Sequence, residues 1–231
     1  SYTVKLLPPA DEIDAASLGK KISAILESVD NRMSTYLPES ELSRLNSNPS
    51  LEWIQVSPEL LTILQLALEV SRITNGTFDI TAGALVNLWG FGPGRVPESI
   101  PDEGAIRRAA EKTGYTKLRL DTATSSIRKA RPDLYIDLSG IAQGYAADRI
   151  ADALDAVPVE NYLIDVSGEI RASGLNGSGQ DWRIGIEKPD SVVRTVKRII
   201  QLRQSGMATS GDYRNFYIRN GKRYSHIIDP R

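Results

Sequence analysis

Hydrophobic and polar residues follow two periods along the chain, and these periods predict both helices and strands. Apolar residues recur at helical spacing between Leu18 and Val29, so residues 12–31 are predicted to form an amphipathic helix. Residues 1–7 alternate in the way that a strand does. The N-terminal part of the chain therefore offers a strand followed by a helix.

Helix-start and helix-stop residues predict further helices. Ser57-Pro58-Glu59 combines a hydroxyl N-cap, a proline in the first turn and an acid there, and Gly76 is a candidate left-handed C-cap. The helix between them, residues 60–73, is apolar almost all round and is expected to be buried. Two more helices are expected at residues 102–113, closed by Gly114, and at residues 141–154.

The second half of the chain is richer in strand patterns. Leu134–Leu138 is predicted to be a strand that leads into the helix at residues 141–154. Later strands are expected at residues 162–166, 182–187 and 195–202, and Asn220-Gly221 predicts a hairpin turn between residues 216–219 and 222–228. The predicted fold class is α+β, with helices first and an antiparallel or mixed sheet behind them. No long linker divides the chain, so residues 1–231 are interpreted as one domain.

Composition narrows the class of protein. The chain has 231 residues, 41% of them hydrophobic and 25% charged, which excludes disorder as the dominant state. The 28 basic and 29 acidic side chains give a net charge of −1, so nucleic acid is not expected as a partner. No apolar run approaches the ~20 residues that a membrane-spanning helix needs.

Cysteine is absent and histidine occurs once, at His226. These counts exclude disulfides, iron–sulfur clusters, thiol catalysis and the zinc motifs that need two histidines. Any metal must be held mainly by oxygen, which favours magnesium or calcium.

General nucleotide-binding motifs are missing. Gly90-x-Gly92-x-Gly94 begins like a dinucleotide-binding fingerprint, but Arg95 and Pro97 follow and no helix is predicted to open there. The stretch is interpreted as a packed surface loop within the glycine- and proline-rich residues 89–104.

Asp137 and the residues after it are the first candidate site. The predicted strand delivers a carboxylate, Gly140 permits close approach of the backbone, and a helix N-terminus follows. Such an arrangement offers amide N–H groups to an anion, a carboxylate to a donor and a turn carbonyl to a cation. A capped helix with Ser139 as N-cap explains the same residues equally well.

Three other segments carry polar groups with two interpretations each. Asp79 follows the capping Gly76, where a plain helix-to-strand turn is the commoner explanation. Residues 205–211 are small and polar enough to line a cleft, or to form a tightly packed strand crossing. His226 is placed on a strand that ends at Asp229-Pro230, where it is either structural or catalytic.

These segments, in this order, resemble successive blocks of the FAD:protein FMN transferases, the ApbE family. The resemblance runs from about residue 30 to residue 231. The blocks are Met33–Tyr36, Ser40–Asn46, Gly76–Gly83, Leu85–Pro93, Asp137–Tyr145, Ala208–Tyr213 and Ser225–Arg231. The fold that the resemblance implies is the ApbE architecture, which is related to the T-fold.

The resemblance implies an enzyme that cleaves FAD, attaches FMN through a phosphoester to a threonine of a target protein, and releases AMP with Mg²⁺ present. The acceptor would be a protein such as a flavinylated subunit of a respiratory complex. Family members are commonly exported and lipid-anchored on the periplasmic side of the inner membrane, so a periplasmic location with an N-terminal lipid anchor is expected.

The resemblance also implies roles for particular residues. His226 would be the general base, and the carbonyl of Gly140 would bind the metal. FAD would be lined by Tyr36, Thr77, Phe78, Asp79, Asp137, Gln143 and Ile228. These roles suit the chemistry, because an alcohol that attacks a phosphoanhydride needs a base for its proton, and imidazole has the side-chain pKa nearest neutral pH.

The chain departs from the family pattern in three places. Members carry a Met-Gly-Thr segment before the first strand, where this chain starts at Ser1, and they continue past Arg231 into a segment whose aspartate and threonine complete the metal site. The chain is therefore expected to be truncated at both ends. Gln143 stands where members often have lysine or glutamate.

Two other functions remain open from the sequence. One is a non-catalytic FAD-binding or flavin-carrier protein, which His226 and Asp137 disfavour and the shortened C-terminal end favours. The other is a Mg²⁺-dependent FAD pyrophosphatase, in which water replaces threonine and the products are FMN and AMP.

Overall fold

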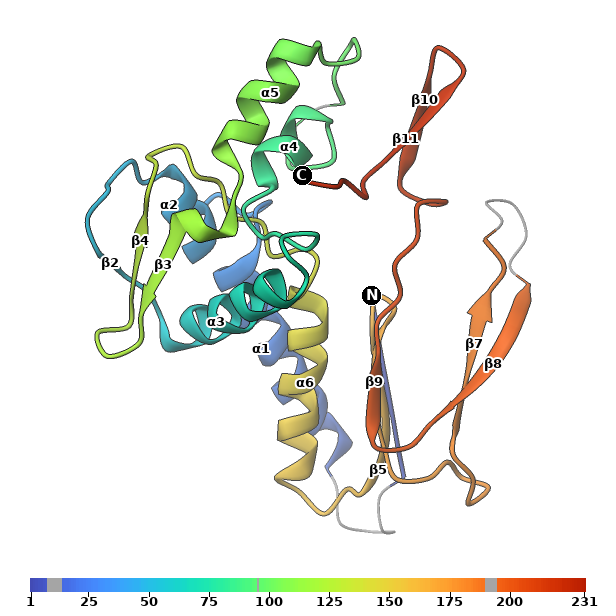
Figure 1. Ribbon diagram of the computed structural model, residues 1–231. Helices are drawn as coiled ribbons and strands as arrows, with labels where there is room; N and C mark the ends of the chain where they lie inside the picture. Colours follow the sequence, from blue (N-terminus) through green and yellow to red (C-terminus); the bar gives the residue numbers. More distant parts are fainter. Residues whose placement is uncertain (8–13, 95, 190–194) are drawn as a thin grey trace. The chain divides into compact units, whose positions relative to one another are not determined.

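A computed structural model describes residues 1–7, 14–94, 96–189 and 195–231 (Figure 1). The chain divides into two compact units: unit 1 comprises residues 1–28 and 143–214, and unit 2 comprises residues 29–142 and 215–231. Each unit is therefore built from two separate stretches of chain. None of the helices in the described ranges has the length and apolar character that crossing a membrane requires.

Unit 1 is built on an antiparallel sheet with the strand order β1-β5-β6-β9. The bounds are Tyr2–Leu7 for β1, Asn161–Val166 for β5, Glu169–Ser173 for β6 and Ser205–Met207 for β9. A separate ribbon pairs β7, Trp182–Glu187, with β8, Val196–Leu202. The helix α6, Ala142–Asp155, belongs to this unit from Gln143 onward, and α1, Ala15–Met33, belongs to it as far as Ser28.

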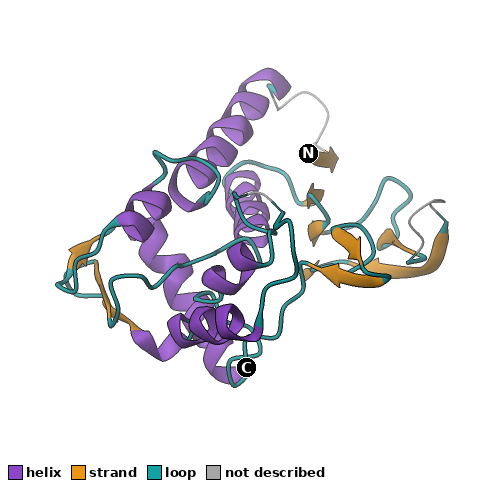
Figure 2. Ribbon diagram, turned by 90° about the horizontal axis from the view of Figure 1, so that it is seen from above, coloured by secondary structure: helices purple, strands orange, loops and turns teal. Residues whose placement is uncertain are grey.

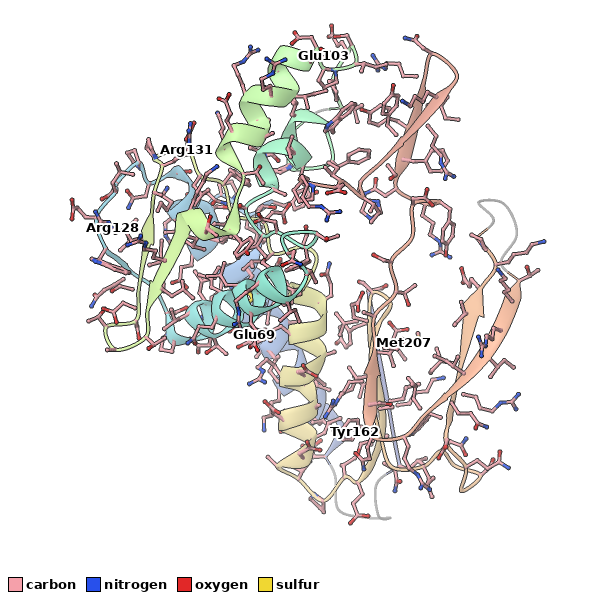
Figure 3. The ribbon with its side chains drawn as sticks, in the orientation of Figure 1. Glu69, Glu103, Arg128, Arg131, Tyr162 and Met207 are labelled. Atoms are coloured by element: carbon pink, nitrogen blue, oxygen red, sulfur yellow. The ribbon has the colours of Figure 1, made fainter. Side chains whose placement is uncertain are left out.

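Alternation along β5 shows how unit 1 buries its core. Tyr162, Ile164 and Val166 are buried while their neighbours are less so, as expected for a strand with one face against helices. The Tyr162 hydroxyl donates to Asp155 Oδ1 at 2.9 Å, and burial together with this carboxylate raises the pKa of Tyr162 to about 12. Figure 3 labels Tyr162 and, on β9, Met207.

Unit 2 contains most of the remaining helices, drawn purple in Figure 2. They are α2 (Glu41–Ser47), α3 (Pro58–Ile73), α4 (Gly83–Leu88), α5 (Glu103–Lys112) and a 3-10 turn at Tyr115–Lys117. A small antiparallel sheet has the order β2-β4-β3, with bounds Ile54–Gln55, Ser126–Lys129 and Leu118–Asp121 respectively. The unit ends in the hairpin of β10, Phe216–Arg219, and β11, Lys222–Ser225.

The predicted N-cap of α3 is confirmed, Asp102 proves to be the N-cap of α5, and the C-cap of α3 is Thr74, two residues before Gly76. Ser57 Oγ accepts from the Leu60 amide at 3.2 Å, and Asp102 Oδ1 accepts from the Ala105 amide at 2.7 Å. Gly76 has a φ of 78°. The hairpin turn is also confirmed, because Asn220 and Gly221 have φ values of 51° and 71°.

The predicted burial of α3 is wrong in part, and the predicted start of α1 lies outside the described residues. The expectation that α3 is buried all round is wrong, because Leu66 is 47% exposed and Ile73 is 69% exposed while the opposite side is buried. The helix predicted at residues 12–31 is found as α1, and residues 12 and 13 lie outside the described part of the chain.

Three further predictions are wrong. Residues 134–138 are not a strand of any sheet, although Leu134, Ile136 and Leu138 are buried. The strand β11 ends at Ser225, so His226 follows it instead of lying on it. The turn that holds Asp79 leads to the helix α4 and not to a strand, so the expected helix-to-strand turn is wrong in its second element. The α+β class is confirmed. The single-domain interpretation stays a prediction.

A buried lysine holds the end of α2. Lys129, on β4, is 1% exposed, and its Nζ donates to the carbonyls of Leu45, Asn48 and Pro132. Burial lowers the pKa of Lys129, and the nearby Asp133 opposes that effect. The ammonium group donates to carbonyls at the C-terminal end of α2, where few intrahelical donors remain, and to the Pro132 carbonyl.

We predict that Lys129→Met lowers the free energy of unfolding by about 1–3 kcal/mol, because it removes three hydrogen bonds to carbonyls from a buried donor. Urea unfolding measures the change. Lys21→Met, on the exposed side of α1, is the matched control and should change stability by no more than about 0.5 kcal/mol. Equal effects from both substitutions would contradict the role assigned to Lys129.

Candidate active site

The side chain of Asn46 holds residues 134–138 in an extended conformation. Asn46 Nδ2 donates to the Ile136 carbonyl at 2.8 Å, and Asn46 Oδ1 accepts from the Ile136 amide at 2.8 Å. These two bonds do what a neighbouring strand would do, which explains why the alternating pattern is present without a sheet. With the residues on either side of it buried, Tyr135 is left on the opposite side from the core, as is Asp137.

Asp137 keeps one carboxylate oxygen available. Its amide donates to the Ile80 carbonyl at 2.7 Å, and its Oδ1 accepts from the Ser139 amide at 2.9 Å and from Ser139 Oγ at 2.5 Å. Oδ2 accepts no hydrogen bond from the described residues. Ser139 therefore closes a turn with Asp137 and is not the N-cap of α6, which begins at Ala142.

Both carboxylate oxygens of Asp79 accept hydrogen bonds that stabilise the fold. Oδ1 accepts from the Thr81 amide at 2.8 Å and from Thr81 Oγ1 at 2.6 Å, and Oδ2 accepts from the Tyr115 amide at 2.8 Å. The Gly114 amide in turn donates to Thr81 Oγ1 at 2.7 Å. The turn after α3 is thus tied to the turn after α5, so Asp79 has a structural role, in a helix-to-helix turn and not in the expected helix-to-strand turn.

Phe78 lies against the backbone of Gly140. A Cβ placed on Gly140 would stand 3.2 Å from Phe78 Cε2, so this position has little room for a side chain. The amides of Ile141 and Ala142 both donate to the Leu138 carbonyl, which closes the turn before α6. The contact brings the block at residues 76–83 and the block at residues 137–145 together, as the sequence predicted.

Tyr135 lies close to Asp137, to Tyr36 and to residues of α4. Burial raises the pKa of Tyr135, a hydrogen bond with Asn87 acts in the opposite direction, and the charges of Asp137 and Tyr36 raise it further. The ring of Tyr135 also occupies the space beside Gly83, where a Cβ would come within 2.4 Å of Tyr135 Cδ1. Gly83, the first residue of α4, therefore has no room for a side chain beside this ring.

Tyr36 is 63% exposed, and its hydroxyl donates to the Phe91 carbonyl at 3.2 Å. The exposed ring sits on a turn fixed by Ser34, whose Oγ accepts from the amides of Tyr36 and Leu37 at 3.1 and 3.2 Å. An exposed aromatic ring with an anchored hydroxyl is a suitable surface for a flat ligand.

His226 is fixed at the base of the β10–β11 hairpin by the Asn215 carbonyl. Its amide donates to this oxygen at 3.2 Å, and its Nδ1 lies 3.1 Å from the same oxygen. Because a carbonyl oxygen can only accept, this contact is a hydrogen bond when Nδ1 carries the proton. In the neutral ring, Nε2 is then the unprotonated nitrogen and can accept a proton.

Comparison with known proteins decides the family. The full chain, residues 1–231, matches the sequence profile of the ApbE family. A curated FAD:protein FMN transferase of Vibrio cholerae is 43% identical over 230 residues, which cover 100% of this chain and 68% of that protein. The chain belongs to the ApbE family.

Other members of the ApbE family are also similar to this chain in sequence and in structure. The FAD:protein FMN transferase of Haemophilus influenzae is 42% identical, with 92% of this chain and 62% of that protein covered. The solved flavin transferase ApbE of Vibrio cholerae superposes with a TM-score of 0.89 at 41% identity, covering 99% of this chain and 72% of that one. A second structure of the Vibrio protein is of a mutant in which a histidine is replaced by glycine. The chain spans 68% and 62% of the lengths of these two curated ApbE relatives.

Within this ApbE chain, unit 2 holds nearly all of the predicted site residues. They are Tyr36, Thr77, Phe78, Asp79, Asp137, Gly140, His226 and Ile228. Gln143 lies in unit 1, in the first turn of α6. The roles given to these residues stay predictions. The hydrogen bonds distinguish Asp79, whose two carboxylate oxygens both have partners, from Asp137, whose Oδ2 has none among the described residues.

The described ranges contain no group of three or more His, Cys, Asp or Glu side chains that could hold a metal ion. The Gly140 carbonyl is a single oxygen, whereas Mg²⁺ takes six ligands in near-octahedral geometry. The residues of the described ranges therefore do not fit a complete magnesium site by themselves.

Sequence reasoning missed four residues that organise this ApbE site, namely Asn46, Asn87, Phe91 and Tyr135. Each lies in or next to a quoted block, but none has a spacing that signals a role. Their partners are 90 residues away for Asn46 and Ile136 and 55 residues away for Tyr36 and Phe91, so only the folded chain pairs them. Residues 205–207 form the edge strand β9, but Gly206 and residues 208–210 are exposed, so the segment is not the tightly packed strand crossing that was one of its two interpretations.

We predict that Asp79→Ala costs about 1–3 kcal/mol of stability, because the amides of Thr81 and Tyr115 lose their acceptor. Asp137→Ala should cost less, about 0.5–1.5 kcal/mol, because it loses only the local turn with Ser139. Urea unfolding of the two variants side by side measures the difference. A larger loss for Asp137→Ala would contradict the division of roles between the two carboxylates.

Proposed function

We propose that this chain carries FAD:protein FMN transferase activity: it cleaves FAD, attaches FMN through a phosphoester bond to a threonine of an acceptor protein, and releases AMP. Membership of the ApbE family and the names of the relatives support the reaction. The observation that carries the proposal is His226, whose Nδ1 is engaged by a carbonyl and whose Nε2 is left as a base.

The proposed chemistry needs one proton acceptor. The threonine oxygen of the acceptor attacks the FMN phosphorus, a new P–O bond forms, and the phosphoanhydride bond to AMP breaks. Nε2 of His226 takes the hydroxyl proton, and the bond from Nδ1 to the Asn215 carbonyl stabilises the resulting imidazolium.

FAD binding would use the remaining residues of the site. The free Oδ2 of Asp137 would accept a hydrogen bond from FAD, and the exposed ring of Tyr36 would contact a flat part of it. Thr77, Phe78 and Ile228 would line the same site in unit 2, and Gln143, in the first turn of α6, is the one proposed FAD residue of unit 1. Asp79 would contribute by shaping its turn, since both of its oxygens are occupied.

Magnesium belongs to the proposal as a requirement of the reaction. A divalent cation neutralises charge that develops on phosphate oxygens during phosphoryl transfer. The Gly140 carbonyl would supply one ligand. Because the described residues do not complete the site, no step of the mechanism is assigned to the ion.

The resemblance to the family is the basis on which an acceptor and a location are proposed. We propose a threonine-containing acceptor such as a flavinylated subunit of a respiratory complex. The proposed location is the periplasmic side of the inner membrane, with a lipid anchor as the only attachment to the membrane. Cell fractionation with and without globomycin, an inhibitor of lipoprotein processing, tests the anchor.

The activity test incubates the protein with FAD, Mg²⁺ and a threonine-containing acceptor, and weighs the acceptor by intact-mass spectrometry. We expect the acceptor to gain the mass of FMN less water, with AMP formed in equal amount, and EDTA to abolish both. Free FMN with AMP would instead identify a pyrophosphatase, and FAD that is bound but unchanged would identify a flavin carrier. Either result contradicts the transferase proposal.

We predict that His226→Asn slows flavin transfer by about 10²–10⁴-fold while FAD stays bound. The amide nitrogen of asparagine can still donate to the Asn215 carbonyl, so the variant removes the base and keeps the contact. In-gel flavin fluorescence follows the reaction, and near-normal transfer by His226→Asn would overturn the assignment.

A further inference from the structure

The loop after α4 is fixed in a defined conformation. The Gly90 amide donates to the Asn87 carbonyl at 3.0 Å, the Phe91 amide donates to the Val86 carbonyl at 3.0 Å, and Gly90 has a φ of 77°. A Cβ on Gly92 would stand 1.7 Å from Asn87 Oδ1, so the loop folds closely over the end of its own helix. The loop therefore presents Trp89 and Phe91 from a rigid base.

Four aromatic rings form one continuous stack between this loop and the hairpin. Trp89 stacks on Tyr224 at 5.3 Å between centroids, Tyr224 on Tyr217 at 5.6 Å, and Tyr217 on Phe91 at 5.4 Å. The two hairpin rings lie opposite one another across β10 and β11, and the two loop rings enclose them. Figure 1 shows the hairpin in red and α4 in green.

The stack gives the hairpin support that it lacks on its own. An isolated two-stranded hairpin is marginally stable in water, whereas each stacked pair contributes about 0.5–1.5 kcal/mol beyond burial. The Tyr217 hydroxyl is buried and has no hydrogen-bond partner among the described residues, so the ring and not a polar contact holds Tyr217 in place.

Phe91 contacts two of the predicted site residues, Tyr36 and His226. Its carbonyl accepts from the Tyr36 hydroxyl at 3.2 Å, and its ring meets His226 edge-on, with 6.3 Å between centroids and an interplanar angle of 60°. The imidazole is thus bounded by the Phe91 ring and by the Asn215 carbonyl. A ring confined in this way has less freedom to turn its Nδ1 away from that carbonyl.

We propose that Phe91 is a positioning residue that holds His226 in the Nδ1–H tautomer, with Nε2 free to accept a proton. The catalytic consequence rests on the proposed function, whereas the tautomer itself does not. Trp89 supplies a ring of similar burial at the other end of the stack, and its stacking partner is Tyr224, so it offers a matched control.

His226 is the only histidine of the chain, so its ring nitrogens can be read directly. The protein is labelled with ¹⁵N-histidine, and a two-bond ¹H–¹⁵N correlation spectrum is recorded at a pH where the ring is neutral. Wild type should show the Nδ1–H tautomer. Phe91→Leu should move both nitrogen shifts towards the averaged values of an unrestrained histidine, and Trp89→Leu should leave them at the wild-type values.

The kinetics of flavin transfer are the second measurement that tests the role of Phe91. Phe91→Leu should lower kcat of flavin transfer by about 10-fold or more, part of the 10²–10⁴-fold that a general base contributes, with little change in KM for FAD. Phe91→Tyr, which keeps the ring, should restore both the tautomer and kcat. Phe91→Met replaces Phe91→Leu in both measurements if the latter does not fold.

The outcomes separate the two proposals. Wild-type nitrogen shifts in Phe91→Leu, or equal changes in Trp89→Leu, would overturn the positioning role even if flavin transfer is observed. A tautomer that depends on Phe91 in a protein without transferase activity would support the positioning role and overturn the proposed function.

Discussion

The paired hydrogen bonds between the Asn46 side chain and the Ile136 backbone are the constraint on which the candidate site depends. They satisfy a buried amide and a buried carbonyl at once, at 2.8 Å each, and no neighbouring strand is needed. Asn46 itself is fixed because Lys129 holds the end of α2 on which it lies. The extended segment then buries alternate residues and turns Tyr135 and Asp137 away from the core.

The two carboxylates of the site illustrate how similar sequence contexts lead to different roles. Both follow an ordered element and both accept from a hydroxyl two residues onward. Asp79 has a second set of partners because the turn after α5 brings the Tyr115 amide to its other oxygen. Asp137 has no such neighbour among the described residues, and its remaining oxygen is open to a ligand. The distinction is one of tertiary neighbours and not of local motif.

The general base of the proposed reaction depends on aromatic packing in the same indirect way. His226 follows a short hairpin that carries few buried contacts of its own, and four stacked rings connect that hairpin to the loop after α4. The Gly90-x-Gly92-x-Gly94 stretch begins like a nucleotide-binding loop in sequence, but here Gly90 turns the chain with a positive φ and Gly92 packs against the Asn87 side chain. The same loop receives the hydroxyl of Tyr36, so it connects the proposed FAD-binding and proton-accepting parts of unit 2.

The sequence by itself determined the features that depend on neighbouring residues. Ser57 and Pro58 mark the start of α3, and Asn220-Gly221 fixes the hairpin turn, because capping and turn conformations involve only a few consecutive residues. The order of the motif blocks along the chain is also sufficient to indicate the family. The tertiary structure alone decided that residues 134–138 form no strand, that β11 stops before His226, and that both carboxylate oxygens of Asp79 have partners while Oδ2 of Asp137 has none among the described residues. The first of these outcomes depends on Asn46 and the last on the Tyr115 amide, which pair with groups distant from them in sequence, and no local pattern encodes such pairings.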